Sequence, residues 1–290
     1  MLPVLLTKTK TRDGVTLDGI YVPPKRKSKT ALIWIHGLTS RFYSGQTLVQ
    51  ELSSQCQKSG IGYFKFNNRG HDIAVRGQDK TPFLGTAFEK FEECLHDIRA
   101  TINFAKNLGY KKMILAGHST GANKALYYMY KTRDPRVRGL VLLGPTSDIA
   151  YDHMKFGRKT IRRRVALAKK MKKAGRFSLL PQKFGIWSAQ RYVSILEEGG
   201  PEDVFPYYNP KALWKELKSV KVPLAVVVGS REEHLDRPLK EFMEAFRKNA
   251  TVAKSFSGII IKGARHSFHG KEKELAKAIV DWIKKLDNRP

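Results

Sequence analysis

The sequence predicts an α/β fold around a mostly parallel β-sheet. Short runs rich in Val, Ile and Leu recur along the 290 residues, and segments long enough to form helices separate most of them. Such near-continuous apolar runs are typical of strands that are buried on both faces of a sheet. Their alternation with helices places the chain in the α/β class.

The elements can be read off in order along the chain. The expected strands are 15–22, 31–35, 62–66, 113–116, 139–143, 224–228 and 257–261, and the expected helices are 44–58, 86–108, 123–131, 237–248 and 271–285. Residues 146–219 interrupt the alternation because they contain no convincing buried strand. A structureless loop of that length is uncommon, so we expect this segment to form helices of its own over one edge of the sheet.

The composition excludes several classes of protein. The 41% of hydrophobic residues, with Phe 15, Tyr 11 and Trp 4, excludes a mainly disordered chain. The two cysteines, Cys56 and Cys94, are too few for a disulfide scaffold and are expected to be buried thiols in a reducing compartment. No run approaches the roughly 20 apolar residues of a membrane-spanning helix, and residues 2–6 are too short for a signal-peptide core. We therefore expect a soluble, cytoplasmic protein.

The strongest chemical signal is the sequence Gly117-His118-Ser119-Thr120-Gly121 between an expected strand and an expected helix. G-x-S-x-G in a strand–turn–helix context predicts a nucleophile elbow, a sharp turn that projects Ser119 above the sheet. A serine hydroxyl is a poor nucleophile, so a base must lie within hydrogen-bond reach.

The base is expected after the last strand, where His266 and His269 occur. His266 is preferred because it lies nearer the strand end, whereas His269 is expected at a helix entry or on the surface. A metal site formed by both histidines is less favoured, since no acidic or thiol ligand is close to them in sequence. The imidazole must be neutral to act as a base, so the rate should fall below the usual histidine pKa of about 6.5.

The acid that orients this histidine is expected in the loop after strand 224–228. Glu232 is the first choice, and Asp236 and Glu233 are the alternatives. All three preserve the order nucleophile, acid, histidine. The expected oxyanion donors are the backbone N–H groups of Thr120 and Leu38, whereas His36 is expected to be a packed loop histidine.

These motifs resemble those of the α/β-hydrolase superfamily, in particular its esterase and acylglycerol-lipase-like branches. The matching pieces are His36-Gly37, the turn 67–72, the elbow 117–121, Val222-Pro223 leading into Gly229, and residues 263–268, in the usual order of the superfamily. Residues 188–192 and 199–203 resemble an uncharacterised branch.

The resemblance implies an α/β-hydrolase fold with a mostly parallel eight-stranded sheet, a core of residues 1–145 and 220–290, and a helical cap of residues 146–219 after the sixth strand. It also implies a serine esterase with a Ser119–Glu232–His266 triad and neither metal nor cofactor. Most members carry aspartate where this chain has Glu232. The cap residues Phe156, Trp187 and Tyr192 are candidate walls of a pocket for a small-molecule ester, with Phe184 and Phe205 as further candidates.

The net charge of +28 favours anionic partners. Residues 155–173 contain ten basic and no acidic residues, with apolar positions near one helical face. This segment is either the solvated face of a cap helix or a weak contact for an anionic membrane surface or, less favoured, nucleic acid. The second functional hypothesis is therefore a catalytically silent hydrolase-fold protein that binds anionic surfaces through this helix. The sequence does not specify an oligomeric state.

Overall fold

The structure, a computed structural model, describes residues 4–77, 83–175, 179–181 and 184–287. Its main sheet has eight strands in the order β1-β2-β4-β3-β7-β8-β9-β10. Their bounds are β1 (Leu5–Lys10), β2 (Thr16–Val22), β3 (Thr30–Ile35), β4 (Gly62–Phe66), β7 (Lys112–His118), β8 (Val137–Leu143), β9 (Leu224–Gly229) and β10 (Phe256–Ile261). All neighbours are parallel except β1 with β2 and β2 with β4. The predicted α/β class and the mostly parallel sheet are confirmed.

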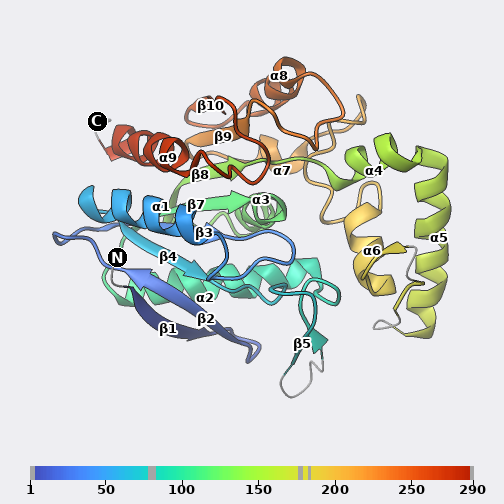
Figure 1. Cartoon of the computed structure of the whole chain (residues 1–290), viewed down its shortest axis with the longest axis horizontal. Helices are drawn as coiled ribbons and strands as arrows, with labels where there is room; N and C mark the ends of the chain where they lie inside the picture. Colours follow the sequence, from blue (N-terminus) through green and yellow to red (C-terminus); the bar gives the residue numbers. More distant parts are fainter. Residues whose placement is uncertain (1–3, 78–82, 176–178, 182–183, 288–290) are drawn as a thin grey trace.

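Helices cover both faces of this sheet (Figure 1). On one face, α1 (Gln46–Lys58) and α9 (Glu272–Asp287) pack together over alternate strand residues such as Leu32, Ile114 and Val227. On the other face, α2 (Cys94–Asn107), α3 (Thr120–Thr132) and α8 (Leu239–Asn249) cover the intervening residues, such as Ile33 and Leu115. Successive side chains of a strand point to opposite faces, so burial on both faces requires the continuous apolar runs seen in the sequence.

The structure differs from the prediction in two features. The edge strand β1 was not expected, because its residues are exposed or half-buried and lack a buried apolar run. The predicted helix over 86–108 begins only with a short 3-10 turn, η1 (Phe91–Glu93), followed by α2. Residues 86–90 are not helical, and a small hairpin of β5 (Val75–Arg76) and β6 (Phe83–Leu84) precedes them. The loop at 86–90 instead supplies partners to a distant helix, as described below.

The segment between β8 and β9 contains α4 (Asp148–Phe156), α5 (Arg158–Ala174), α6 (Ala189–Leu196) and α7 (Lys215–Lys218). Helices α4, α5 and α6 share a separate apolar cluster and lie at the end of the molecule away from β1 (Figure 1). Residues Phe205, Trp214 and Leu217 pack into the main core instead. Among the described residues, no helix is both long and apolar enough to cross a membrane.

Candidate active site

The residues that point to chemistry gather where the parallel strands β3, β7, β8, β9 and β10 end. Ser119 lies in the turn between β7 and α3 with φ 55° and ψ −130°, a conformation that L-residues rarely adopt. A Cβ atom at Gly117 would lie 2.2 Å from the carbonyl oxygen of Gly121, and one at Gly121 would lie 2.2 Å from that of Ile35. The turn therefore requires glycine at both positions, as G-x-S-x-G predicts.

The loop after β3 lies directly against this turn. A Cβ atom at Gly37 would lie 2.9 Å from Ser119 Cβ and 3.4 Å from Ser119 Oγ. His36 fixes the loop, since its Nδ1–H donates to the Gly37 carbonyl at 2.9 Å while its Nε2 accepts from the Asn68 N–H at 3.1 Å. Burial lowers the pKa of His36 well below the usual range, so this side chain is neutral and structural.

This arrangement brings two backbone N–H groups near Ser119. Thr120 is the first residue of α3, and the first N–H groups of a helix have no partner within it. Leu38 is half-buried and follows Gly37, which is in close contact with Ser119. Both predicted oxyanion donors thus belong to segments that meet at the nucleophile elbow.

His266, in the loop after β10, faces the loop after β9. Its Nδ1 lies 2.9 Å from each carboxylate oxygen of Glu232, whose side chain is fully buried. Burial alone would raise the pKa of this carboxyl group, but hydrogen bonds from His234 and His266 lower the pKa of Glu232 to about 2. Glu232 is therefore an ionised acceptor for the His266 Nδ1–H.

The end of β8 and the elbow hold His266 from two sides. A Cβ atom at Gly144, just after β8, would lie 3.0 Å from His266 Nδ1 and 3.4 Å from Glu232 Oε2. His118, the neighbour of Ser119, donates its Nε2–H to the His266 carbonyl at 2.8 Å. The two histidine rings lie 5.1 Å apart between centroids. The described hydrogen bonds do not include one from Ser119 Oγ to His266, and such catalytic bonds often tighten only when substrate binds.

The competing candidates have other partners. Asp236 pairs with Arg237 at 2.8 Å, and Glu233 accepts the backbone N–H of His266 at 2.9 Å. His269 is 92% exposed and lies 3.4 Å from Glu272. Of the three carboxylates considered from the sequence, Glu232 is the one that contacts the imidazole of His266.

Sequence reasoning missed His118 and His234. Burial, followed by the nearby charge of His266, lowers the pKa of His118 to about 4, so it is a neutral donor that fixes the His266 backbone. His234 donates to Glu232 from its ring Nδ1 at 3.1 Å and from its backbone N–H at 3.2 Å. The sequence shows that His118 lies inside the G-x-S-x-G motif and that His234 lies two residues after Glu232. Their contacts depend on the tertiary fold and cannot be read from the sequence.

Glu232, His234 and His266 form a group that could hold a metal ion. Their ligand atoms all lie within 4.8 Å of one another. Two imidazoles and a carboxylate are a donor set that zinc accepts. In the structure, Glu232 hydrogen-bonds the Nδ1 atoms of both rings.

The family is decided by a match over residues 3–286 to the model of a family described as "Protein of unknown function (DUF1749)". The chain belongs to this family. No curated protein matches the sequence.

Solved structures similar to this DUF1749 chain include esterases and a lipase. An esterase from Pyrococcus furiosus is 18% identical, with a TM-score of 0.63 and coverage of 98% of this chain and 91% of that one. Est1E from Butyrivibrio proteoclasticus is 16% identical, with a TM-score of 0.64 and coverage of 98% and 99%. A soluble variant of monoglyceride lipase from Saccharomyces cerevisiae is 15% identical, with a TM-score of 0.69 and coverage of 99% and 96%. The DUF1749 chain has the α/β-hydrolase fold.

The predicted wall residues occupy different environments. Phe156 is 40% exposed, Trp187 is half-buried, and Tyr192 is buried in the apolar cluster of α4, α5 and α6 against Phe184. Phe205 lies in the main core, 5.4 Å from the ring of Phe246. Phe205 is therefore a core residue here, and a pocket lined by Phe156, Trp187 and Tyr192 stays a prediction.

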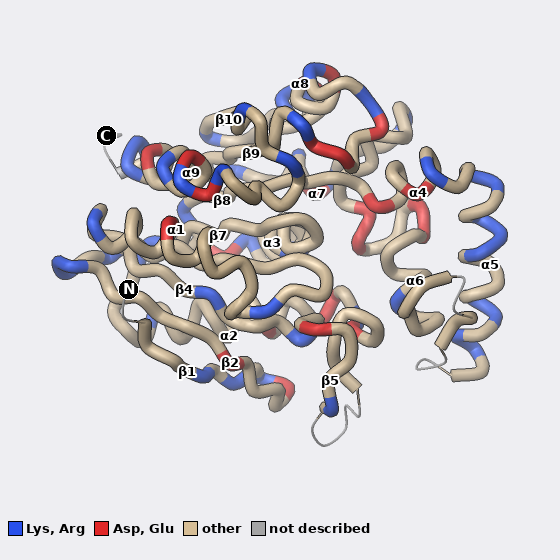
Figure 2. The backbone as a smooth tube through the Cα atoms, in the orientation of Figure 1, with Lys and Arg blue, Asp and Glu red and all other residues tan. Residues whose placement is uncertain are grey.

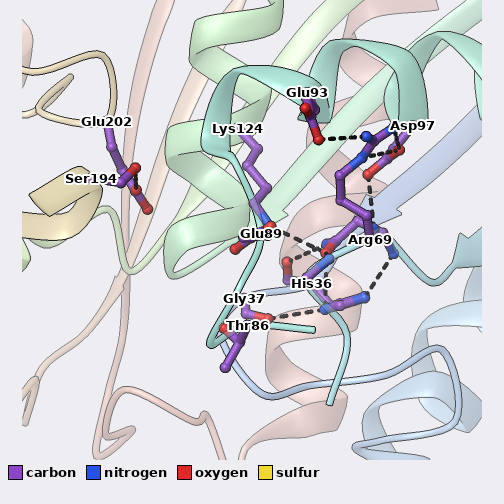
Figure 3. Close-up of polar contacts among 12 residues, drawn as sticks. His36, Gly37, Arg69, Thr86, Glu89, Glu93, Asp97, Lys124, Ser194 and Glu202 are labelled. Atoms are coloured by element: carbon purple, nitrogen blue, oxygen red, sulfur yellow. Dashed lines mark hydrogen bonds and ion pairs between the residues drawn. The ribbon is translucent and has the colours of Figure 1, made fainter. Parts of the chain in front are cut away.

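A buried chain of charges connects α3, the helix that follows the elbow, to α6, and Figure 3 shows its first pair, Lys124 beside Glu89. Lys124 on α3 contacts Glu89 at 2.6 Å, and Glu89 contacts Arg191 on α6 at 3.1 Å. Arg191 also pairs with Glu202. The side chains of these four residues are at most 1% exposed. Arg191 also donates to the Thr86 carbonyl at 3.2 Å. The non-helical segment 86–90 is thus the part of the core on which α6 rests.

Proposed function

We propose that this protein is a serine hydrolase that cleaves carboxylic esters through an acyl-serine intermediate. The observation that carries the proposal is the contact of His266 with the buried, ionised Glu232, at the sheet edge where the strained Ser119 turn meets Gly37. These are the parts that acyl transfer requires: a nucleophile, a base, an orienting acid and oxyanion donors.

The reaction follows from these positions. His266 Nε2 takes the Ser119 proton as Oγ attacks the ester carbonyl, and the N–H groups of Thr120 and Leu38 bind the oxyanion. Collapse of this intermediate expels the alcohol, which takes the proton from His266. Water then attacks the acyl-serine with His266 again as base, the bond between Ser119 Oγ and the acyl group breaks, the acid leaves, and the proton returns from His266 to Ser119 Oγ. Glu232 stays ionised throughout and holds the tautomer with hydrogen on Nδ1. The chemistry requires no metal and no cofactor.

The substrate proposal is less specific. We propose a small-molecule ester bound between the sheet edge and a cap formed by residues 146–219, with Phe156, Trp187 and Tyr192 as candidate walls. An esterase and a monoglyceride lipase are among the similar structures named above, which supports an ester.

The test combines turnover and covalent labelling. Wild-type protein should hydrolyse short-chain p-nitrophenyl esters and react with a fluorophosphonate. Ser119→Ala should abolish both, while Ser54→Ala on α1 should change neither. Glu232→Gln should lower kcat by roughly 10⁴-fold, as loss of the orienting carboxylate does in such triads. A folded wild-type protein that shows neither turnover nor labelling, or labelling that survives Ser119→Ala, contradicts the proposal.

A second candidate, binding of an anionic lipid surface, rests on α5. This helix carries basic residues along its length and no acidic ones (Figure 2). Arg158 and Arg162 share Glu198, whereas Lys159, Arg163 and Lys170 lie on the side opposite the buried residues and are exposed. The apolar side chains of Met154 and Leu167 are 54% and 42% exposed nearby, which favours lipid over nucleic acid.

Cosedimentation with vesicles containing anionic lipid tests this candidate. Lys159→Gln/Arg163→Gln/Lys170→Gln should weaken binding far more than Lys248→Gln/Lys254→Gln/Lys262→Gln, which removes the same charge elsewhere. Equal losses would mean that the overall charge of +28 is responsible, and binding to RNA alone would replace the lipid with nucleic acid. Lipid binding without esterase activity would favour the catalytically silent alternative.

A further inference from the structure

We infer that His234 is a positioning residue that acts on the catalytic histidine through Glu232, so that the relay has four members instead of three. This inference rests on the proposed ester hydrolysis. The structure shows Glu232 between two imidazoles, one from its own loop after β9 and one from the loop after β10.

The hydrogen bonds to Glu232 define the arrangement. Its Oε1 lies 2.9 Å from His266 Nδ1, 3.1 Å from His234 Nδ1 and 3.2 Å from the His234 N–H. Its Oε2 lies 2.9 Å from His266 Nδ1. The carboxylate is fully buried, so each lone pair without a donor would carry a desolvation cost. With His234 in place, the charge of Glu232 is shared between two rings and its orientation is fixed from both sides.

His234 is itself held by packing. Its ring lies 5.0 Å from that of Tyr151 on α4 and meets the His266 ring edge-on at 4.4 Å between centroids. Its side chain is 34% exposed, so the ring is a partly solvated neighbour of the site. These contacts leave its Nδ1–H directed at Glu232, and they link the helix that follows β8 to the acid of the relay.

The glutamate side chain is long enough for both contacts. A glutamate carboxylate lies one methylene farther from the backbone than that of aspartate. In this loop it accepts from the residue two positions along and still reaches the imidazole on the next loop.

The charges around His234 predict a measurable signature. The groups that face it are Glu232, Glu233 and Asp148, with His266 and Tyr151 in ring contact. The hydrogen bond to Glu232 is the main reason that the pKa of His234 is raised, and burial opposes it. A positive charge on His234 offsets part of the Glu232 charge that acts on His266. Without it, that charge acts on His266 alone, and the base stays protonated to a higher pH.

The test compares His234→Leu, His234→Gln and the control His269→Leu, an exposed histidine of the neighbouring loop. His234→Leu should lower kcat roughly tenfold, with KM unchanged. This is the lower end of the roughly 10–100-fold loss seen when a hydrogen-bond partner that orients a metal-ligating side chain is removed. The acid limb of kcat/KM should move to higher pH. His234→Gln keeps a neutral donor and should restore most of kcat but still show the shifted limb. His269→Leu should match wild type.

Three further measurements make the result decisive. EDTA in the assay keeps divalent ions off the three ligand groups. Thermal unfolding identifies folded variants, and if the leucine variant is unfolded, the pH profile of His234→Gln decides. Fluorophosphonate labelling of wild type separates the two claims: absence of labelling defeats the proposed hydrolysis. Normal labelling and turnover with an unshifted acid limb in the folded His234 variants overturn only the role of His234.

Discussion

The loops at the carboxyl edge of the sheet and the helices between β8 and β9 hold their side chains by different means. At the sheet edge, backbone segments touch so closely that a single Cβ at Gly37 or Gly144 would lie 2.9–3.0 Å from Ser119 or His266. In the inserted segment, α4, α5 and α6 share an apolar cluster, and ion pairs add further attachments. Arg191 on α6 is fully buried between two glutamates, whereas Arg162 on α5 pairs with Glu198 in solvent.

The difference concerns what each region tolerates. Interiors packed at van der Waals contact respond to a change of one methyl group, because neighbouring atoms have nowhere to move. Ion pairs respond to burial instead, since removing one partner from a buried pair leaves an uncompensated charge, whereas water screens an exposed one. Added volume should therefore damage the sheet edge most, and removed charge should damage α6 but not α5.

The largest expected effect on stability is that of Arg191→Met. This change leaves Glu89 with Lys124 as its remaining cation and leaves the buried Glu202 carboxylate with a neutral donor, the Ser194 hydroxyl, in place of a cation. The free energy of unfolding should fall by about 3–5 kcal/mol, as in other buried pairs that lose one member. Urea denaturation measures it. A loss below about 1 kcal/mol would show that burial does not govern this link.

Gly37→Ala should give the next largest effect, on catalysis. Its new Cβ must displace the loop from Ser119, which moves the Leu38 N–H away from the oxyanion. Loss of one such donor lowers kcat by roughly 10²–10³-fold. Initial rates with an activated ester measure it, and Gly60→Ala, whose Cβ would meet no atom within 4 Å, is the control for a glycine-to-alanine change away from the site. Equal kcat for Gly37→Ala and wild type would contradict the close contact.

A smaller effect is expected at His118 as the pH falls. Its pKa is about 4 in the folded protein, held down by burial, against about 6.5 when unfolded, so the unfolded state binds more protons in between. Stability is fully present above pH 6.5 and is lost as the pH falls toward 4. His118→Gln keeps an N–H donor without this titration.

Urea denaturation at pH 7 and pH 5 measures the difference. Wild type should lose about 2 kcal/mol more than His118→Gln between these values. His36 is buried in both proteins, so its contribution cancels. An equal pH dependence in the two proteins would show that His118 is not buried in neutral form.

The two regions also differ in how well the sequence predicted them. The strands of the sheet can be predicted because burial on both faces requires continuous apolar runs. The elbow can be predicted because its turn requires glycines at fixed spacing. Chain order along these elements predicts Ser119 and His266, but it fits Glu232, Glu233 and Asp236 alike, and the contact with His266 is what distinguishes Glu232. His234 and His118 do not, because a histidine next to a motif acquires its role only when another loop arrives beside it.

In the inserted segment, the sequence predicted helices but not their attachment. The sequence indicates a basic helix over 155–173. It gives no sign that Arg191 is buried, because its partners Glu89 and Glu202 come from other parts of the chain. The segment 86–90 has helix-forming residues but is not helical, and its Thr86 carbonyl accepts a hydrogen bond from Arg191. The burial of Arg191 and the non-helical backbone of 86–90 both depend on contacts between residues far apart in sequence, which local sequence patterns do not encode.

The smallest expected effect is that of Arg162→Met. Arg162 is 61% exposed, and Arg158 hydrogen-bonds the same Glu198 carboxylate, so loss of one arginine leaves the acid paired. Water screens exposed pairs and salt weakens them, so the change in unfolding free energy should be far smaller than that for Arg191→Met and should shrink further at high salt. Urea denaturation at two salt concentrations checks it. A loss comparable to that of Arg191→Met would mean that pairing outweighs burial, and the distinction between α5 and α6 would fail.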